Sequence, residues 1–281
     1  MAWSYTTVEQ LENVLSIRED SGIAPELQRA RLLGIIEGVS QLIDRITERT
    51  FRIYEGSMVF TPEFYDFLLL PDLLSVTTME LDYDCDGDYE VTLSPTTDYL
   101  LEPNNASQHE RPYTRLRVRV HSPYHLPKFA QVLRVTGKWG YWERLRKTGT
   151  TVTTAIAEGD DEIEVSNYER IQVGWTLKIN DEQMYVRDKN VNGTGKVTVV
   201  RAQNGSSEAE HAADSVIYRY VYPEALETAA ILQASRVYRR SETPLGIVNN
   251  PGDIGWRAVY VPKEDVDVVS HLRPFRKRNI L

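Results

Sequence analysis

Residues 25–51, PELQRARLLGIIEGVSQLIDRITERTF, carry the strongest helical pattern in this chain. Their apolar side chains recur at three- and four-residue spacing, which is the period of one face of an α-helix. Pro25 stands where a helix can begin, because a proline at the first helical position sacrifices no hydrogen bond. The pattern predicts a helix over residues 25–50 with one buried stripe: Leu32, Ile35, Ile36, Val39, Leu42, Ile43 and Ile46.

Two further helices are predicted, one on each side of this stretch. Thr6-Thr7-Val8-Glu9 fits a capping box in which Thr6 and Glu9 exchange hydrogen bonds, so we expect a short helix over residues 7–16. Pro223 opens an alanine-rich segment with helical periodicity, which predicts a helix over residues 223–240. Helices from both ends of the chain therefore bracket the residues between them.

Residues 53–142 alternate short apolar runs with Pro, Asp and Gly, which is typical of strands and turns and predicts a β-subdomain. The run from Arg115 to Val120 alternates most regularly, and it places Arg115, Arg117 and Arg119 on one face of a strand. These arginines form either a solvated outer face or a contact with a neighbouring subunit or an acidic partner.

Residues 147–220 hold a second set of strand-like runs, separated by Asn-Asp and Asn-Gly turns. The expected fold class is α+β: a helical bundle of N- and C-terminal helices with a β-subdomain, plus an inserted small all-β barrel or sandwich domain. Residues 1–146 and 221–281 are expected to form one α+β domain, 147–220 the inserted β domain, and 262–281 an extended C-terminal arm.

The chain has 281 residues and a formal charge of −9. This charge argues against a protein that grips nucleic acid over its whole surface, because phosphate binding needs clustered Lys and Arg. No apolar run approaches the roughly 20 residues of a membrane helix, and the first residues lack the pattern of a signal peptide. Cys85 is the only cysteine, which excludes an internal disulfide. We expect a protein that stays where it is made and binds no membrane.

An acidic segment, Asp82 to Asp88, follows the first half of an EF-hand calcium loop, with oxygen ligands at alternate positions. Its twelfth position is Leu93 instead of the glutamate that completes such a loop, and predicted strands flank it. Two interpretations follow. The segment is a β-hairpin tip with an Asp-Gly turn, or it is a weak metal site formed by Asp82, Asp84 and Asp86.

No other constellation predicts chemistry. No nucleophile stands in a recognisable catalytic setting, and no glycine-rich loop precedes a helix, so we predict neither an enzyme nor a cofactor. Pro123 lies between His121 and His125 and prevents the helical face that a zinc-binding histidine pair needs. Trp139 and Trp142 either pack at a domain junction or stack on bases or sugars.

The C-terminal segment concentrates basic side chains around one aromatic residue: Arg273, Phe275, Arg276, Lys277 and Arg278. A basic tail with an aromatic anchor can become ordered when it docks into a groove or adds a strand to a partner. A solvated disordered end and a contact with DNA are the alternatives. We expect that removal of residues 270–281 leaves the fold intact.

The order of these elements resembles the head-to-tail connector (adaptor) family of long-tailed bacteriophages. The motifs that carry the resemblance are Thr6 to Leu15, Leu27 to Phe51, the Gly-Lys-Trp-Gly-Tyr strand end at Gly137 to Tyr141, and Pro223 to Tyr238. They lie within residues 1–142 and 221–281. The β unit between Tyr141 and Val221 departs from simpler family members and looks like an insertion.

The resemblance implies a structural virion protein without catalysis. It would be a subunit of a ring, commonly of twelve copies, that joins the portal of the phage head to the tail or stopper and forms part of the DNA channel. Implied partners are further copies of the chain, the portal protein, a stopper or tail-completion protein, and double-stranded DNA that passes through the lumen without sequence-specific binding.

The resemblance also implies a place in the virion neck after synthesis in the host cytoplasm, and a role in genome ejection. The segment Arg273 to Arg278 would be the portal-docking arm. The alternative is a calcium- or carbohydrate-binding β module of a virion or cell-surface protein, with Asp82, Asp84, Asp86 and the indole rings of Trp139 and Trp142 as its site.

Overall fold

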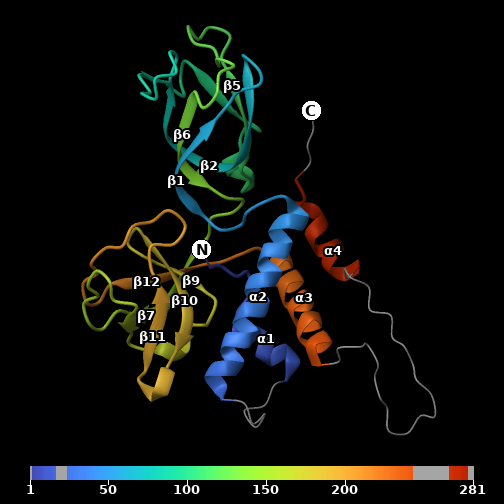
Figure 1. The fold of residues 1–281 in the computed structure, drawn as a ribbon, viewed down its shortest axis with the longest axis vertical. Coiled ribbons are helices and arrows are strands. Elements are labelled where there is room, and N and C mark those ends of the chain that lie inside the picture. Colours follow the sequence, from blue (N-terminus) through green and yellow to red (C-terminus); the bar gives the residue numbers. More distant parts are fainter. Residues whose placement is uncertain (1, 17–23, 243–265, 278–281) are drawn as a thin grey trace, which may run out of the picture. The chain divides into compact units, whose positions relative to one another are not determined.

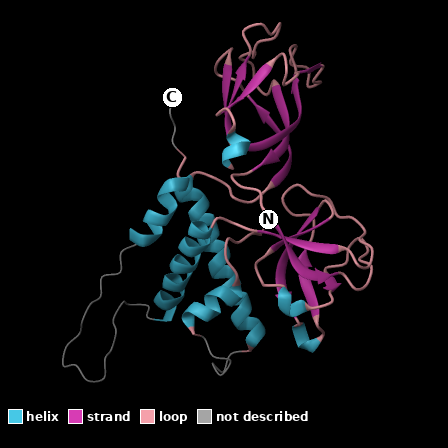
Figure 2. Cartoon of the chain, turned by 180° about the vertical axis from the view of Figure 1, so that it is seen from behind, coloured by secondary structure: helices cyan, strands magenta, loops and turns pink. Residues whose placement is uncertain are grey.

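A computed structural model describes residues 2–16, 24–242 and 266–277 of the chain. Within them the fold is α+β, with four α-helices and two antiparallel six-stranded sheets. Figures 1 and 2 show the helices side by side and the strands gathered into sheets. The predicted fold class is confirmed. No helix among the described residues is both long and apolar enough to cross a membrane.

The chain divides into two compact units. Unit 1 comprises Met1–Glu48, Arg144–Gln203 and Ser207–Leu281, and unit 2 comprises Arg49–Glu143 with Asn204–Ser206. The four α-helices thus fall in one unit with the second sheet, whereas the sequence pattern places the three predicted helices in a domain with the first sheet. The description of residues 147–220 as an insertion stays a prediction.

Helices from both ends of the chain form one bundle in unit 1: α1 Val8–Leu15, α2 Pro25–Thr47, α3 Glu224–Glu242 and α4 Val266–Leu272. α3 contacts the three other helices, so segments far apart in the sequence lie side by side (Figure 1). α2 buries Leu32, Ile36 and Ile43 of the predicted stripe. It ends at Thr47, three residues before the predicted end, where Glu48 adopts a left-handed conformation.

The N-cap of α1 is Thr7 rather than the predicted Thr6. Thr7 Oγ1 accepts a hydrogen bond from Gln10 N (3.2 Å), and Gln10 Oε1 accepts one from Thr7 N (3.1 Å). Both registers satisfy the capping-box motif in the sequence. Tertiary contacts decide between them, because the Glu9 carboxylate accepts instead from Val173 N at 3.0 Å.

The second sheet closes into a small barrel. Its strands run in the order β7-β12-β9-β10-β11-β8. The edge strands β7 and β8 meet beyond their ends through a bridge between Val152 and Val165 and a hydrogen bond from Ser166 N to Thr151 O (2.9 Å). The sequence left a barrel and a sandwich as alternatives. A single sheet that closes on itself and so has no exposed edge strands is a barrel. The strands are β7 Leu145–Thr151, β8 Glu162–Glu164, β9 Thr176–Ile179, β10 Glu182–Lys189, β11 Lys196–Val200 and β12 Val216–Tyr220.

Gly174 lets the N-terminal segment lie against this barrel. Its φ of +99° favours glycine, and a Cβ there would come within 2.7 Å of Ser4 Oγ. Ser4 Oγ donates to Gly174 O at 2.8 Å, and Val8 N donates to Val173 O at 3.0 Å. These bonds hold the start of the chain between the helices and the barrel of unit 1.

Unit 2 is built on the other sheet. Its strands lie in the order β1-β6-β2-β5-β4, and β3 pairs with the end of β2. β2 is 15 residues long, and shifts in its register let it pair with β5 near its start and with β6 toward its end. The buried core includes Leu73, Leu116 and Leu133. The strands are β1 Tyr54–Phe60, β2 Phe67–Leu81, β3 Val91–Thr92, β4 Tyr99–Glu102, β5 Tyr113–Val118 and β6 Leu133–Trp139.

The described part of the C-terminal segment is helical, which differs from the extended arm that the sequence predicts. α4 is followed by a 3₁₀ turn, η4 Arg273–Phe275. Val268 and Leu272 are buried, and α4 contacts both α3 and α2. A helix of 7 residues is too short for a clear periodic signal, and its stability comes from packing.

We expect Leu272→Ala to lower the free energy of unfolding by about 2–5 kcal/mol, because it leaves a cavity where a buried leucine packs. Val266→Ala in the same helix is the control, since Val266 is 77% exposed and its loss should change stability by about 0.5 kcal/mol or less. Denaturant unfolding followed by circular dichroism measures both variants. Equal stability of the two would contradict the packing of α4 in the bundle.

Candidate functional site

The predicted docking arm is a basic end of the helical bundle. Arg273 and Arg276 are exposed, and Phe275 is half-buried. Lys277 N donates to Thr47 O at 2.8 Å, which ties the segment to the end of α2. Arg278 lies outside the described residues. The four described residues therefore lie on one short segment whose backbone is fixed by the bundle.

The three arginines predicted as a subunit contact lie on β5 and just beyond it. Arg115 Nη1 and Arg117 Nε lie 3.6 Å and 3.1 Å from the Glu102 carboxylate on β4. Arg119 Nε donates to Tyr99 O at 3.1 Å. Half-exposed pairs of this kind at the surface contribute only about 0–1 kcal/mol to stability, but they offset part of the positive charge on this face. The role of the arginines as a subunit contact stays a prediction.

The turn between β2 and β3 brings four carboxyl groups together. Ligand atoms of Asp82, Asp84, Asp86 and Glu90 all lie within 4.8 Å of one another. Glu90 was not among the predicted ligands, although it occupies the ninth position of the loop, which calcium loops also use. The sequence therefore found three of the four members of this cluster.

Hydrogen bonds from the backbone shape this turn. Asp82 is 4% exposed, and its two carboxylate oxygens accept from Cys85 N at 2.6 Å and from Gly87 N at 3.0 Å. Partial desolvation and the neighbouring charges of Asp86 and Glu90 raise the pKa of Asp84. Asp82 thus serves the turn itself, as the hairpin interpretation expects.

Trp139 is not available to stack on a ligand. It is 2% exposed, its Nε1 donates to Gly56 O at 3.0 Å, and its ring centroid lies 5.7 Å from that of Phe60. Trp142 is half-buried. The carbohydrate-stacking interpretation is therefore wrong for Trp139, because the core of unit 2 encloses its indole ring.

The sequence reasoning missed a buried carboxylate in the barrel. Glu182, the first residue of β10, has a side chain with no exposed surface, and it accepts hydrogen bonds from Arg201 Nε (2.9 Å) and Nη2 (2.6 Å). His211 Nε2 lies 2.7 Å from the same carboxylate. The backbone N–H groups of Ala202 and Ala209 donate to it, each at 3.2 Å. No sequence motif signals this cluster, because its members come from three separate segments.

The charge on Glu182 is maintained by these donors. Burial by itself raises the pKa of Glu182, but the hydrogen bonds from Arg201, His211 and the backbone outweigh that effect, and the pKa is lowered. Asn180 Nδ2 lies 3.3 Å from His211 Nδ1. When this amide donates, the neutral His211 ring carries its proton on Nε2 and directs it at Glu182. The cluster holds three segments of the barrel together and includes no nucleophile.

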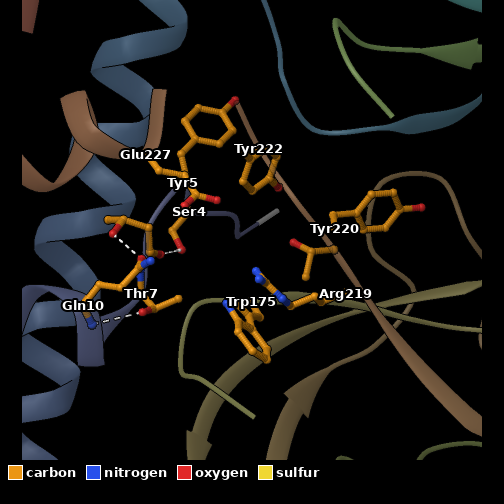
Figure 3. Close-up of a pocket in the computed structure, with 11 residues that line it drawn as sticks. Ser4, Tyr5, Thr7, Gln10, Trp175, Arg219, Tyr220, Tyr222 and Glu227 are labelled. Carbon is orange, nitrogen blue, oxygen red and sulfur yellow. Dashed lines mark hydrogen bonds between the residues drawn. The ribbon is translucent and has the colours of Figure 1, made fainter. Parts of the chain in front are cut away.

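A small polar hollow lies where the N-terminal segment, the barrel and α3 meet inside unit 1 (Figure 3). Its volume of about 10 Å³ suits one water molecule rather than a cofactor. Arg219 lies with its guanidinium carbon 4.4 Å from the centroid of the Trp175 ring. Burial lowers the pKa of Arg219 and raises the pKa of Glu227. The charge of each of these two residues acts in the opposite direction on the pKa of the other. The hollow is a polar joint of the fold.

Comparisons with known proteins give a likeness to solved structures. No family profile matches the chain, and no curated protein matches it. Among solved structures, the chain is similar to one described as the neck of an empty GTA particle computed with C6 symmetry. The two are 14% identical over 99% of this chain and 92% of that chain, with a TM-score of 0.44. Likeness of this degree leaves the function to be argued from the residues of this chain.

We expect Glu182→Gln to lower the free energy of unfolding by about 3–5 kcal/mol at pH 7, because it leaves Arg201 buried without its counter-charge. The folded pKa of Glu182 is lowered, so its contribution is present above the ordinary carboxyl pKa and is lost as pH falls through the folded value. The deficit of the variant should therefore shrink in acid. Denaturant unfolding over a series of pH values measures it.

Glu164→Gln in the same barrel is the matched control. Its side chain is 45% exposed and pairs with Lys196 at 3.4 Å, so its loss should change stability by about 1 kcal/mol or less. A deficit for Glu182→Gln that equals the control, or that stays constant with pH, would contradict the role of the buried cluster.

Proposed function

We propose that this chain is a structural virion protein, a subunit of the ring that joins the portal of a long-tailed phage head to the tail or stopper. The observation that carries the proposal is the helical bundle. In it α1 and α2, which precede both β regions in the sequence, pack with α3, which follows them. The order of these elements is that of the connector family. The strand end at Gly137 to Tyr141 and the helix that follows Pro223 also support it.

The charge of the chain fits a ring through which DNA passes. At −9, the protein has no excess of basic groups with which to hold phosphates over a broad surface. A channel wall that repels phosphate lets double-stranded DNA slide without sequence-specific binding during genome ejection. The protein would then act by position within the neck of the virion, without catalysis or a cofactor.

The C-terminal segment suits docking to the portal. Arg273 and Arg276 are exposed, so they can pair with carboxylates of a partner, and Phe275 offers an aromatic ring beside them. The tie from Lys277 to α2 keeps this segment at one place on the bundle. We place the portal contact there, and we place a contact between neighbouring copies of the ring at Arg115, Arg117 and Arg119.

A second candidate function is a calcium-binding β module, and the observation that favours it is the group of four carboxyl groups between β2 and β3. Oxygen ligands at this density suit Ca²⁺. Its carbohydrate-binding form loses support, because Trp139 is buried.

Reversal of the basic charges on the arm should abolish attachment to the portal. The double variant Arg273→Glu, Arg276→Glu should keep its fold, because both side chains are exposed. Electron microscopy of purified portal rings mixed with the full chain measures attachment. Closed rings of the chain on the portal, seen in the same images, test ring formation.

The control is the double variant Arg146→Glu, Lys147→Glu, which makes the same change in net charge at exposed positions of β7. Point variants are preferable to removal of residues 270–281, since the structure shows that such a deletion also removes the buried Leu272. Attachment of the arm variant at the wild-type level would rule out the docking arm. A wild-type chain that neither binds portal rings nor forms closed rings would rule out the connector.

Calcium titration separates the two candidate functions. The calcium module predicts stoichiometric binding in isothermal titration calorimetry that Asp84→Ala abolishes, and the connector predicts no such binding. Asp82→Ala should lower the free energy of unfolding by about 1–3 kcal/mol even without calcium, because Cys85 N and Gly87 N lose their acceptor. Equal stability of Asp82→Ala and the wild type without calcium would contradict the structural role of that carboxylate.

A further inference from the structure

Exposed apolar side chains gather in unit 2 around the loop between β1 and β2. Phe64 is 39% exposed, Tyr65 56%, Leu69 45% and Phe129 57%. Single exposed apolar residues are ordinary on protein surfaces, but a group of them marks a surface that meets another molecule. We call these four residues the apolar tip.

Contacts within unit 2 hold the apolar tip in shape. The rings of Phe64 and Phe67 stack with their centroids 4.3 Å apart. Lys128 Nζ lies 4.4 Å from the centroid of the Tyr65 ring, and Leu126 N donates to Tyr65 O at 3.0 Å. A surface that is already ordered loses little conformational entropy when a partner binds.

A groove opens beside two of these residues. Its volume is about 250 Å³, below the roughly 300–1,000 Å³ of most small-molecule sites, so it suits one or two side chains better than a cofactor. Its floor and walls are mainly apolar, and one charged residue stands among them. The lining residues are Phe60, Thr61, Glu63, Phe64, Leu68 and Leu69.

The loops around the tip are acidic. Residues 61–66, 82–90 and 120–131 contain seven carboxyl groups and one lysine, Lys128. Residues 82–90, the acidic turn between β2 and β3, lie near the tip. The ring of His125 connects them, because it is 5.7 Å from the ring of Tyr83 in this turn and 6.0 Å from the ring of Tyr65 in the tip. A partner of this surface therefore meets apolar side chains with an excess of carboxylates in these loops. On the strand side lies Arg115, 5.4 Å from the centroid of the Phe67 ring, whose charge is offset by Glu102 at 3.6 Å.

We infer that the apolar tip is a docking surface for a basic segment of a partner protein, with one large apolar side chain of that segment in the groove. The groove supplies apolar area, and Glu63 with the acidic turn supplies charge complementary to Arg and Lys. Nucleic acid is a poor occupant, because these carboxylates repel phosphate. The inference is argued from residues of unit 2 alone. The contact between copies proposed above involves Arg115, the register partner of Leu69 on β5, so a second copy of the chain is the competing occupant that the test has to separate.

Selection of displayed random peptides on the full chain tests this surface. Peptides are enriched on the wild type while an excess of soluble Leu69→Ser competes for those that bind elsewhere. We expect the recovered peptides to share one large apolar residue beside Arg or Lys. Their binding should weaken about tenfold or more in Leu69→Ser and also in Glu63→Lys, since these substitutions remove the apolar wall and the complementary charge.

Val216→Ser is the matched control, because Val216 is an exposed valine of unit 1, and it should bind these peptides like the wild type. Circular dichroism of each variant checks that it is folded. Recovery of acidic peptides, or of none that distinguish the wild type from Leu69→Ser, would overturn the inference. Self-association of the wild type that Leu69→Ser abolishes would also overturn it, since the occupant would then be a second copy of the chain.

Discussion

The fold of unit 1 depends on the burial of one face of α2. Most of the stability of a helix in a protein comes from packing of its apolar face, and α2 carries that face along Leu32, Ile36 and Ile43. α3 packs against α2, and its buried residues include small side chains such as Ala230 and Ala234, which permit close packing of helices. Because the two helices stand on opposite sides of both β regions in the sequence, this one interface joins the two ends of the chain.

The barrel is specified in a different way, through closure of its sheet and a buried charge. A buried carboxylate is costly unless donors surround it, and Glu182 has donors from Arg201, His211 and the backbone. Such a cluster adds little net stability compared with apolar packing, but it penalises any arrangement that separates its members. It therefore selects which segments of the barrel meet.

The distribution of charge links the fold to the proposed role. On the sheet of unit 2, basic side chains find carboxylate partners, as in the Arg134–Glu80 pair at 2.9 Å. The loops at the apolar tip keep an excess of carboxylates, and the C-terminal segment keeps exposed arginines. Surfaces of opposite charge on one chain suit a protein that meets different partners at different places, which is what a component of an assembly has to do.

Elements whose signals are local could be predicted from the order of the residues. Helical periodicity predicted α2 to within three residues, and alternating carboxylates marked three of the four clustered acidic groups. Strand alternation placed Leu116 in the core, between arginines that are half-buried. The N-cap at Thr7, the helix α4, the Glu182 cluster and the groove at the apolar tip became visible only in the folded chain. Each of these depends on partners brought together by folding, and a pattern read along the chain carries no information about such contacts.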